Sequence, residues 1–203
     1  LSSARRSFEQ SLVIGRRLED TDPTTAAYVA LDLRHLGFIA ETQGDTGGAR
    51  AYLAESLAIF RRLAATNDEA TWQREISQSS EHLAGTLVAQ GDINGAGLLY
   101  EEALAICRRL AARDPSSLRL QSDLASVLLA VGLFRNDRDD RAGARLNYEE
   151  ALTIRRAIVA ADRTNLLEQM SLSVNLSAVA SVSEDLGDLP AAQHYYEEVL
   201  VIR

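Results

Sequence analysis

The sequence contains no lysine: all 21 basic residues are arginine, and 29 acidic residues outnumber them, which leaves a net charge of −8. A nucleic-acid-binding surface needs a basic stripe that neutralises phosphates, so this balance argues against a nucleic-acid partner. The chain also lacks any run of the roughly 18 apolar residues that a membrane-spanning helix needs, so we expect no membrane partner. Its single cysteine, Cys107, excludes an internal disulfide and fits a reducing, cytoplasmic compartment.

Catalytic and metal-binding motifs are missing as well. The sequence has no glycine-rich phosphate loop, no Gly-x-Ser-x-Gly elbow and no His-Glu-x-x-His. Its histidines, His35, His82 and His194, have no cysteine or clustered carboxylates at ligand spacing, so we predict no metal site. No base is recognisable near Cys107, which we expect to be a small, semi-exposed packing residue. The sequence therefore predicts that the chain is not an enzyme and has no cofactor.

What the sequence does contain is one pattern, Ala-x-x-x-aromatic/Leu-x-x-x-Leu-x-Ile, in five copies. Its alanines are spaced by 45, 47, 48 and 48 residues, at Ala4, Ala49, Ala96, Ala144 and Ala192. A fixed period in this range indicates stacked structural repeats. Apolar residues in the third copy, over 100–110, recur at a period near 3.6, so each copy is predicted to lie on a helix. We call these the motif helices.

Second helical segments lie between the motif helices, and we call them the intervening helices. They share two apolar columns, Val29/Ile76/Leu124/Leu172 and Leu36/Leu83/Val131/Val179. The residue after the second column is always small: Gly37, Ala84, Gly132 and Ala180. We expect these small residues to face the alanine column and let two helix backbones approach closely, because a larger side chain would cost about 1–3 kcal/mol.

Glycine followed by aspartate marks the turns from an intervening helix to the next motif helix. The pairs are Gly44-Asp45, Gly91-Asp92 and Gly187-Asp188. Glycine can end the first helix in a left-handed conformation, and aspartate can cap the next. In the third repeat the turn over 135–141 has Asp139 where the others have glycine, which predicts an early helix end or a looser turn. That turn is either a solvated polar turn or a charged contact patch.

Aspartate followed by proline marks two turns in the other direction, at Asp22-Pro23 and Asp114-Pro115. This pair predicts an N-cap and a first helical turn. The layout is then one motif helix in 1–22 and repeats over 23–67, 68–114, 115–163 and 164–203. Each helix has roughly 18–22 residues, about nine helices in all.

Adjacent glutamates recur with the repeat at 101/102, 149/150 and 197/198, and predict a solvated helix face. Glu102 and Arg109 share a helix face, as do Glu149 and Arg156, and these residues can form ion pairs with neighbouring repeats. Each exposed ion pair would stabilise the fold by about 0–1 kcal/mol. Trp72 stands at the start of an intervening helix. We expect it to cover the end of the core, and the alternative is a binding aromatic.

Two stretches resemble the tetratricopeptide repeat (TPR): Leu36-Gly37 with Gly44-Asp45 and Ala49, and Ala96-x-x-x-Tyr100-Glu-Glu-Ala103. The resemblance covers essentially the whole chain. The period of about 48 residues exceeds the usual 34 or so, and the usual proline at the end of the second helix is absent, so the chain looks like a long-helix variant common in bacterial proteins. The resemblance implies an all-α fold, a right-handed α-solenoid of antiparallel helix pairs, in one array over 1–203.

In TPR arrays the first helix of each repeat lines a concave, partner-binding face. Carried onto this sequence, its inward positions are Arg34, Phe38, Glu41, Gln78, Glu81, Val88, Leu129, Leu133, Ser177 and Ser181. These positions mix apolar centres with acidic edges, which suits a peptide with apolar anchors and some basic residues. Phe38 and Leu129 are the predicted anchors. The family's clamp for a C-terminal carboxylate needs Lys/Arg and Asn at set positions, and only Arg34 fits, so we predict no such clamp.

The predicted function is a non-catalytic scaffold that binds a peptide or protein segment on this concave face. The alternative is a sensor or autoinhibitory arm of a multidomain signalling enzyme, because such arrays are often attached to signalling NTPases or caspase-like peptidases in the family. The chain starts without methionine and starts and stops inside a motif copy, which predicts a fragment of a larger protein. The first and last motif helices should expose apolar faces, so we also predict end-to-end self-association.

Overall fold

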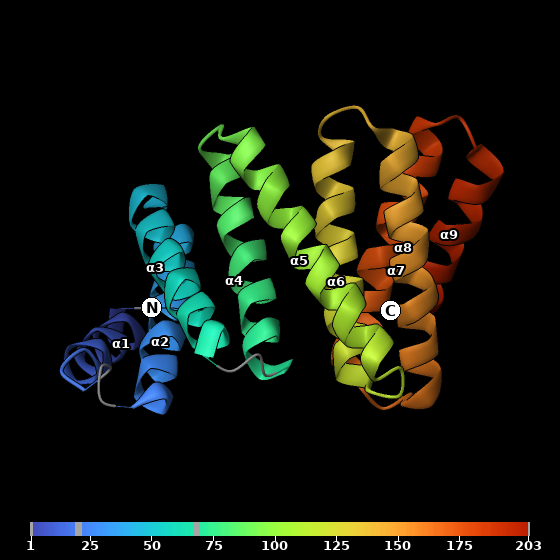
Figure 1. Ribbon diagram of the computed structural model, residues 1–203. Helices are drawn as coiled ribbons and strands as arrows, with labels where there is room; N and C mark the ends of the chain where they lie inside the picture. The colour runs from blue at the N-terminus through green and yellow to red at the C-terminus, as the bar shows by residue number, and fades with distance from the viewer. Residues whose placement is uncertain (1, 19–21, 67–69, 203) are drawn as a thin grey trace. The chain divides into compact units, whose positions relative to one another are not determined.

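The computed structural model describes residues 2–18, 22–66 and 70–202, and the regular structure in these ranges is entirely α-helical (Figure 1). The nine helices found there are α1 (Ser2–Gly15), α2 (Pro23–Thr42), α3 (Thr46–Thr66), α4 (Ala70–Ala89), α5 (Ile93–Arg113), α6 (Leu118–Asn136), α7 (Arg141–Ala161), α8 (Leu166–Asp185) and α9 (Leu189–Ile202). The odd-numbered helices are the motif helices and the even-numbered ones are the intervening helices. The predicted all-α fold is confirmed. None of the described helices is both long and apolar enough to cross a membrane.

The chain forms two compact units, Leu1–Ile106 and Cys107–Arg203, with the boundary inside α5. In unit 1, α1 packs on α2, α2 on α3 and α3 on α4. In unit 2, α6 packs on α7, α7 on α8 and α8 on α9. Short turns over 43–45, 137–140, 162–165 and 186–188 join neighbours within a unit, so these helix pairs run antiparallel, as predicted (Figure 1). The repeat boundaries drawn from the sequence stay a prediction.

The column of small residues lets paired helices approach closely, but its contact differs from the one expected. Gly37 and Gly132 are buried, and a Cβ added to Gly132 would lie 2.3 Å from Cε1 of Tyr148. A Cβ added to Gly37 would lie 2.6 Å from Cγ of Leu53. These two glycines therefore lie closest to the aromatic/Leu position of the motif, and Gly37 also borders the alanine column, because its added Cβ would lie 3.5 Å from the Ala49 carbonyl oxygen. Helix side chains tilt towards the N-terminus, so the large residue one turn after the alanine covers the alanine's own turn.

The glycine-aspartate turns form as predicted. Gly44, Gly91 and Gly187 have φ angles of 77, 79 and 80°, in the left-handed region. Asp139 has φ 62° and occupies the same region in the third repeat. Its turn closes with a hydrogen bond from the Asp140 N–H to the Arg135 carbonyl at 3.1 Å. The prediction of a looser turn is therefore wrong, because aspartate tolerates the left-handed conformation better than most residues.

The two Asp-Pro turns behave differently. Asp22 caps α2 as predicted and accepts a hydrogen bond from the Thr25 N–H at 3.0 Å. The prediction for Asp114 is wrong, because α6 begins at Leu118 with Ser117 as its N-cap. The Asp114 carboxylate instead accepts hydrogen bonds from the N–H and hydroxyl of Ser116, at 3.2 and 2.7 Å. Because these hydrogen bonds to Ser116 already engage the Asp114 carboxylate in a local turn, it does not cap α6.

Ion pairs link successive motif helices at regular intervals. They are Arg16–Glu55, Arg61–Glu102, Arg108–Glu150 and Arg156–Glu198, at 2.6–2.7 Å. The expected pairing of Glu102 and Arg156 with neighbouring repeats is confirmed. Glu149 instead pairs with Arg145 on its own helix, at 2.8 Å. These pairs are largely solvent-exposed, so each stabilises the fold by at most about 1 kcal/mol.

Candidate functional site

In unit 1 the predicted binding position Phe38 is an exposed aromatic residue on α2. Its side chain is 55% exposed and meets the ring of His82 on α4 edge to face, with ring centroids 6.3 Å apart. Burial, with the Arg34 guanidinium nearby, lowers the pKa of His82, so this ring is neutral near pH 7. Gly85, one turn after His82, is exposed and carries no side chain. Phe38, His82 and Gly85 form what we call the aromatic shelf.

The other predicted positions of α2 are partly buried and already engaged. Arg34 forms an ion pair with Glu75 of α4 at 2.7 Å, and both side chains are about 15% exposed or less. Glu41 accepts a hydrogen bond from the Thr86 hydroxyl of α4. These contacts hold α2 against α4. Because Glu75 occupies the Arg34 guanidinium, this arginine is positioned for packing rather than for clamping a carboxylate.

The remaining predicted positions of unit 1, Gln78, Glu81 and Val88, are partly buried on α4. Tyr28 of α2, 64% exposed, was missed by the sequence analysis. The sequence did hold a signal for it, because its equivalents in the later repeats are Glu75, Asp123 and Ser171, all polar. A large apolar side chain at a position that is otherwise polar was therefore visible in the repeat alignment.

In unit 2 the structure separates the two predicted leucines. Leu129 is partly buried and packs against the core cluster that contains Tyr148 and Leu176. Leu133, one turn later on α6, is 50% exposed. Leu129 therefore belongs to the packing of the unit, and Leu133 is the better candidate for an anchor.

The serines predicted on α8 differ in exposure. Ser177 is partly buried, and its hydroxyl donates a hydrogen bond to the Ser173 carbonyl at 2.9 Å. Ser181, one turn later, is exposed. Met170, 65% exposed on the same helix, is a further apolar side chain that the sequence analysis missed.

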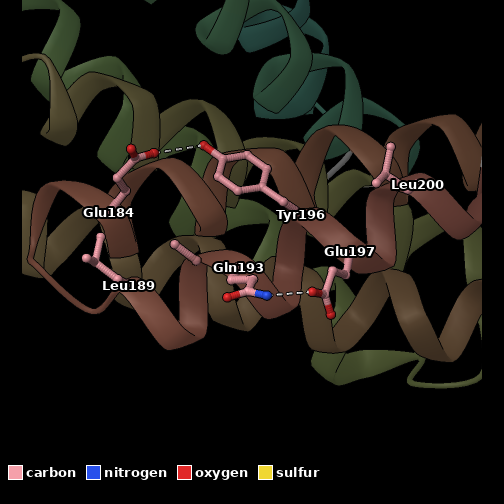
Figure 2. A pocket seen from close by; sticks show the side chains of 7 residues that line it. Glu184, Leu189, Gln193, Tyr196, Glu197 and Leu200 are labelled. Carbon is pink, nitrogen blue, oxygen red and sulfur yellow. Dashed lines mark hydrogen bonds between the residues drawn. The ribbon is translucent and has the colours of Figure 1, made fainter.

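An open hollow of about 390 Å³ lies on the surface of α8 and α9 (Figure 2). Its lining residues are Glu184, Leu189, Ala192, Gln193, Tyr196, Glu197 and Leu200. The Tyr196 hydroxyl lies 3.3 Å from a carboxylate oxygen of Glu184, and Gln193 Nε2 donates to Glu197 at 2.8 Å. The hollow thus combines apolar walls with two carboxylates.

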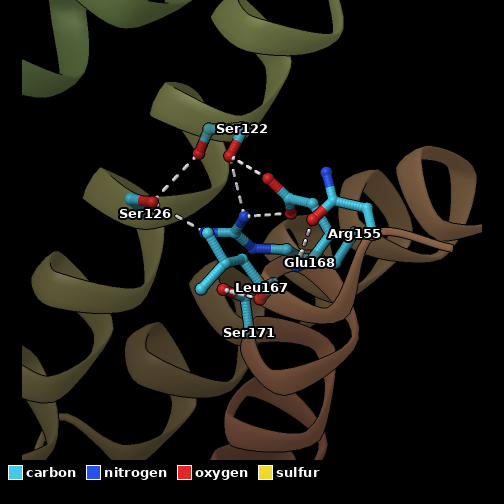
Figure 3. A network of polar contacts seen from close by, with 7 residues as sticks. Ser122, Ser126, Arg155, Leu167, Glu168 and Ser171 are labelled. Atoms are coloured by element: carbon cyan, nitrogen blue, oxygen red, sulfur yellow. Dashed lines mark hydrogen bonds and ion pairs between the residues drawn. The ribbon is translucent and has the colours of Figure 1, made fainter. Parts of the chain in front are cut away.

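A polar network in unit 2 holds α6, α7 and α8 together (Figure 3). Arg155 of α7 is 4% exposed and pairs with Glu168 of α8 at 2.6 Å. Its guanidinium also donates to the hydroxyls of Ser122 and Ser126 on α6, at 2.9 and 2.7 Å. The network is a packing feature, because these partners surround the arginine and cover its charge.

The positions equivalent to Arg155 are Phe60 and Cys107, and both are buried. The expectation that Cys107 is semi-exposed is therefore wrong, since it is only 2% exposed. Phe60 stacks on Trp72, with ring centroids 6.4 Å apart, and Trp72 is the equivalent of Glu168. This contact supports the expectation that Trp72 covers the core. An aromatic pair in unit 1 thus occupies the place of an ion pair in unit 2.

Among the residues that the structure describes, no three His, Cys, Asp or Glu side chains gather as a metal ion would need. The exposed positions described above carry aromatic and aliphatic side chains, with carboxylates on the same helices. These groups can bury apolar side chains of a partner and pair with its cations.

Comparison with known proteins bears on the fold. The family model of the tetratricopeptide repeat matches residues 78–115. BtubC (BKLC) from P. vanneervenii has a similar structure, with a TM-score of 0.62 and 17% identity over 100% of this chain and 90% of that one. A structure of nearly identical TPR-like repeats from a putative kinesin light chain of Podosopora anserina is similar too. Its TM-score is 0.53 and its sequence identity is 20%, over 99% of this chain and 87% of that one.

RapI in its apo form is also similar, with a TM-score of 0.63 and 15% identity, over 98% of this chain. The chain spans about half of RapI, covering 49% of it. The search of curated proteins found no match. At these identities the similar structures show the fold alone, and this agrees with the family match over 78–115: the chain has a helical repeat fold of the tetratricopeptide type.

Proposed function

We propose that the chain is a non-catalytic interaction module that binds a peptide or protein segment through the exposed positions of its intervening helices. TPR-type folds commonly serve as interaction scaffolds, and the observation that carries the proposal is the aromatic shelf of unit 1. Phe38 is 55% exposed there, yet His82 fixes its ring from the side. An aromatic side chain held in place loses little conformational entropy when it buries an apolar group of a partner.

The charge of the chain favours a partner segment with basic residues. The net charge is −8, and Glu41 and Glu81 lie on the same two helices as the shelf. An apolar anchor flanked by arginine or lysine would therefore be attracted to this face, and the attraction would weaken as salt rises. A cytoplasmic location fits the same proposal.

A selection from a displayed library of random 16-residue peptides would test the proposal. Peptides retained by the wild-type protein should bind Phe38→Asp at least tenfold more weakly, because the charge replaces the apolar contact. The matched control is Leu98→Asp, since Leu98 is 69% exposed but lies on the motif helix α5. Helicity of both variants should match wild type by circular dichroism.

For unit 2 the corresponding variant is Leu133→Asp rather than Leu129→Asp, because a charge at Leu129 would enter the core cluster. Failure to retain any peptide would count against the proposal. The proposal would also be contradicted if the peptides bind Phe38→Asp and Leu133→Asp as tightly as wild type but do not bind Leu98→Asp. The binding surface would then lie on the motif helices.

A further inference from the structure

The aromatic shelf lies at a position of the repeat that stays open although the next intervening helix is present. Phe38 of α2 is 55% exposed even though α4 packs beside it through the His82 ring. Its equivalent in unit 2, Leu133 of α6, is 50% exposed, and there α8 lies beside α6. The repeat itself therefore leaves this position uncovered in both units.

Three residues at the shelf depart together from the other repeats. Phe38 is aromatic, whereas the later members of its column are Gly85, Leu133 and Ser181. In this column Gly85 is the member without a side chain, and it lies on α4 next to the shelf's histidine turn. Thr86 is polar, whereas the other members of its column are apolar: Ile39, Phe134 and Val182. Unit 1 thus combines an aromatic ring, a bare backbone position and a hydroxyl that the equivalent place of unit 2 lacks.

The hydroxyl of Thr86 fixes a carboxylate at the end of the shelf. Thr86 is 2% exposed, and its hydroxyl donates a hydrogen bond to Glu41 of α2. Glu41 lies about one turn after Phe38 on the same helix, and Thr86 directly follows Gly85 on α4. The carboxylate is therefore held near both the exposed ring and the position that has no side chain.

The missing side chain of Gly85 leaves space that a partner group can enter. A Cβ added to Gly85 would meet the Tyr100 hydroxyl oxygen of α5 at 3.8 Å, an ordinary contact distance. Tyr100 itself is 8% exposed, so its hydroxyl lies at the base of this space. A group that enters above Gly85 therefore meets an aromatic ring, a carboxylate and a hydroxyl.

The charges around the shelf favour a cation, although an arginine of the chain lies nearby. The Arg34 guanidinium pairs with Glu75 at 2.7 Å, which neutralises its charge. Burial, with Arg34 nearby, lowers the pKa of His82, so this ring adds no positive charge near pH 7. Glu41 then leaves the shelf with a negative charge, and the chain as a whole carries −8.

We propose that the shelf selects an arginine of the partner segment, an inference that rests on the proposed function. The arginine side chain lies on the Phe38 ring, and its guanidinium pairs with Glu41. One guanidinium N–H reaches the Tyr100 hydroxyl through the space above Gly85. A guanidinium suits these groups because it is planar, permanently charged and carries five donors in a fixed fork. Lysine offers the charge without the plane, and leucine offers packing without the charge.

Three displayed libraries of 16-residue peptides would test this preference. They are random except for a central residue, which is arginine, lysine or leucine. At physiological salt the wild-type protein should retain the arginine library about tenfold better than the leucine library and about threefold better than the lysine library.

Synthetic forms of the best arginine peptide separate charge from shape. Their affinities would be measured by fluorescence anisotropy with arginine, lysine or citrulline at the central position. Lysine should weaken binding about threefold, because it keeps the charge but loses the stacking plane. Citrulline should weaken it about tenfold, because it keeps the plane but loses the charge that pairs with Glu41.

Variants of the protein locate the arginine. Phe38→Leu should weaken the arginine peptide about 3- to 10-fold, because it keeps an apolar side chain but removes the ring. Phe38→Asp should weaken it as well, because aspartate is too short to replace the ring as a packing surface. Gly85→Leu places the side chain of the equivalent Leu133 in the space and should weaken it about tenfold.

A charge variant and its control complete the set. Glu41→Gln should weaken the arginine peptide about 3- to 10-fold and reduce the difference between arginine and citrulline. Its fold should be kept, because the glutamine oxygen can still accept from the Thr86 hydroxyl. The matched control is Glu101→Gln on α5, an exposed carboxylate away from the shelf, which should leave the affinity unchanged.

The outcomes distinguish this inference from the proposed function. If the leucine library is retained as well as the arginine library and its peptides are lost with Phe38→Asp, the shelf binds apolar anchors and the arginine site is wrong. Equal binding of the arginine, lysine and citrulline peptides would also overturn the arginine site. So would an equal loss with Glu41→Gln and Glu101→Gln, because net charge would then explain the preference. If none of the three libraries is retained, both the inference and the proposed function fail.

Discussion

Replacing Gly132 by alanine should destabilise unit 2, although glycine-to-alanine changes usually stabilise a helix. The added Cβ would lie 2.3 Å from Cε1 and 2.5 Å from Cδ1 of Tyr148, whereas carbon atoms normally pack at about 3.5–4 Å. The ring would have to move by more than about 1 Å. It is 2% exposed and packs in one cluster with Leu172 and Leu176, so no open space is available to it.

Two opposing energies set the size of the effect. Overpacking of a filled core costs about 1–3 kcal/mol, and the better helix propensity of alanine returns about 0.5–1 kcal/mol. The net loss for Gly132→Ala should therefore lie between about 0 and 2.5 kcal/mol, with a central value of about 1 kcal/mol. Gly85→Ala is the matched control in α4, because its Cβ would meet only the Tyr100 hydroxyl oxygen at 3.8 Å, an ordinary contact. That variant should gain about 0.5–1 kcal/mol.

Urea unfolding followed by circular dichroism would measure both changes, and hydrogen exchange of the amides in α6 and α7 would show that the loss lies in unit 2. The single tryptophan, Trp72, reports on unit 1 by fluorescence. If Gly132→Ala gains as much stability as Gly85→Ala, the close contact with Tyr148 does not constrain this position, and the packing argument for the small-residue column fails.

Further predictions concern other named contacts. Arg155→Phe alone should lower the free energy of unfolding by about 3 kcal/mol, measured in urea, because Glu168 keeps a buried charge without its partner. The double variant Arg155→Phe with Glu168→Trp should lie within about 1 kcal/mol of wild type. A double variant as unstable as the single one would contradict this. Asp139→Gly should raise the free energy of unfolding by about 0.5–1 kcal/mol, because glycine adopts φ 62° without strain, and Asp139→Ala should lower it. Burial, with the Asp137 carboxylate nearby, raises the pKa of Tyr148 to about 12. The unfolded chain loses this proton near pH 10, so stability should hold below pH 10 and fall between pH 10 and 12, and Tyr148→Phe should remove that fall in a pH series of thermal unfolding.

The candidate site was only partly predictable, because exposure on a helix depends on what packs against it. The repeat alignment placed Phe38 and Leu133 on the intervening helices, and both are exposed. It also placed Leu129 among the anchors, and the structure packs this leucine on the core cluster. The two leucines lie one turn apart, so sequence spacing does not distinguish them. Arg34 fitted a clamp by residue type, but Glu75 of the next intervening helix occupies it.

The sequence by itself determined the period, the succession of helices and most of the turns. These features depend on local physics: a period near 3.6 in apolar residues defines a helix face, and glycine in Gly44-Asp45 permits the left-handed turn. Only the tertiary structure decided which side chains meet across helices. The Arg155–Glu168 ion pair and the Phe60–Trp72 stack fill equivalent places with opposite chemistry. This position in the repeat can hold either pair, provided that the two side chains fit each other. The sequence of one helix does not reveal the fit, because the second side chain comes from another helix.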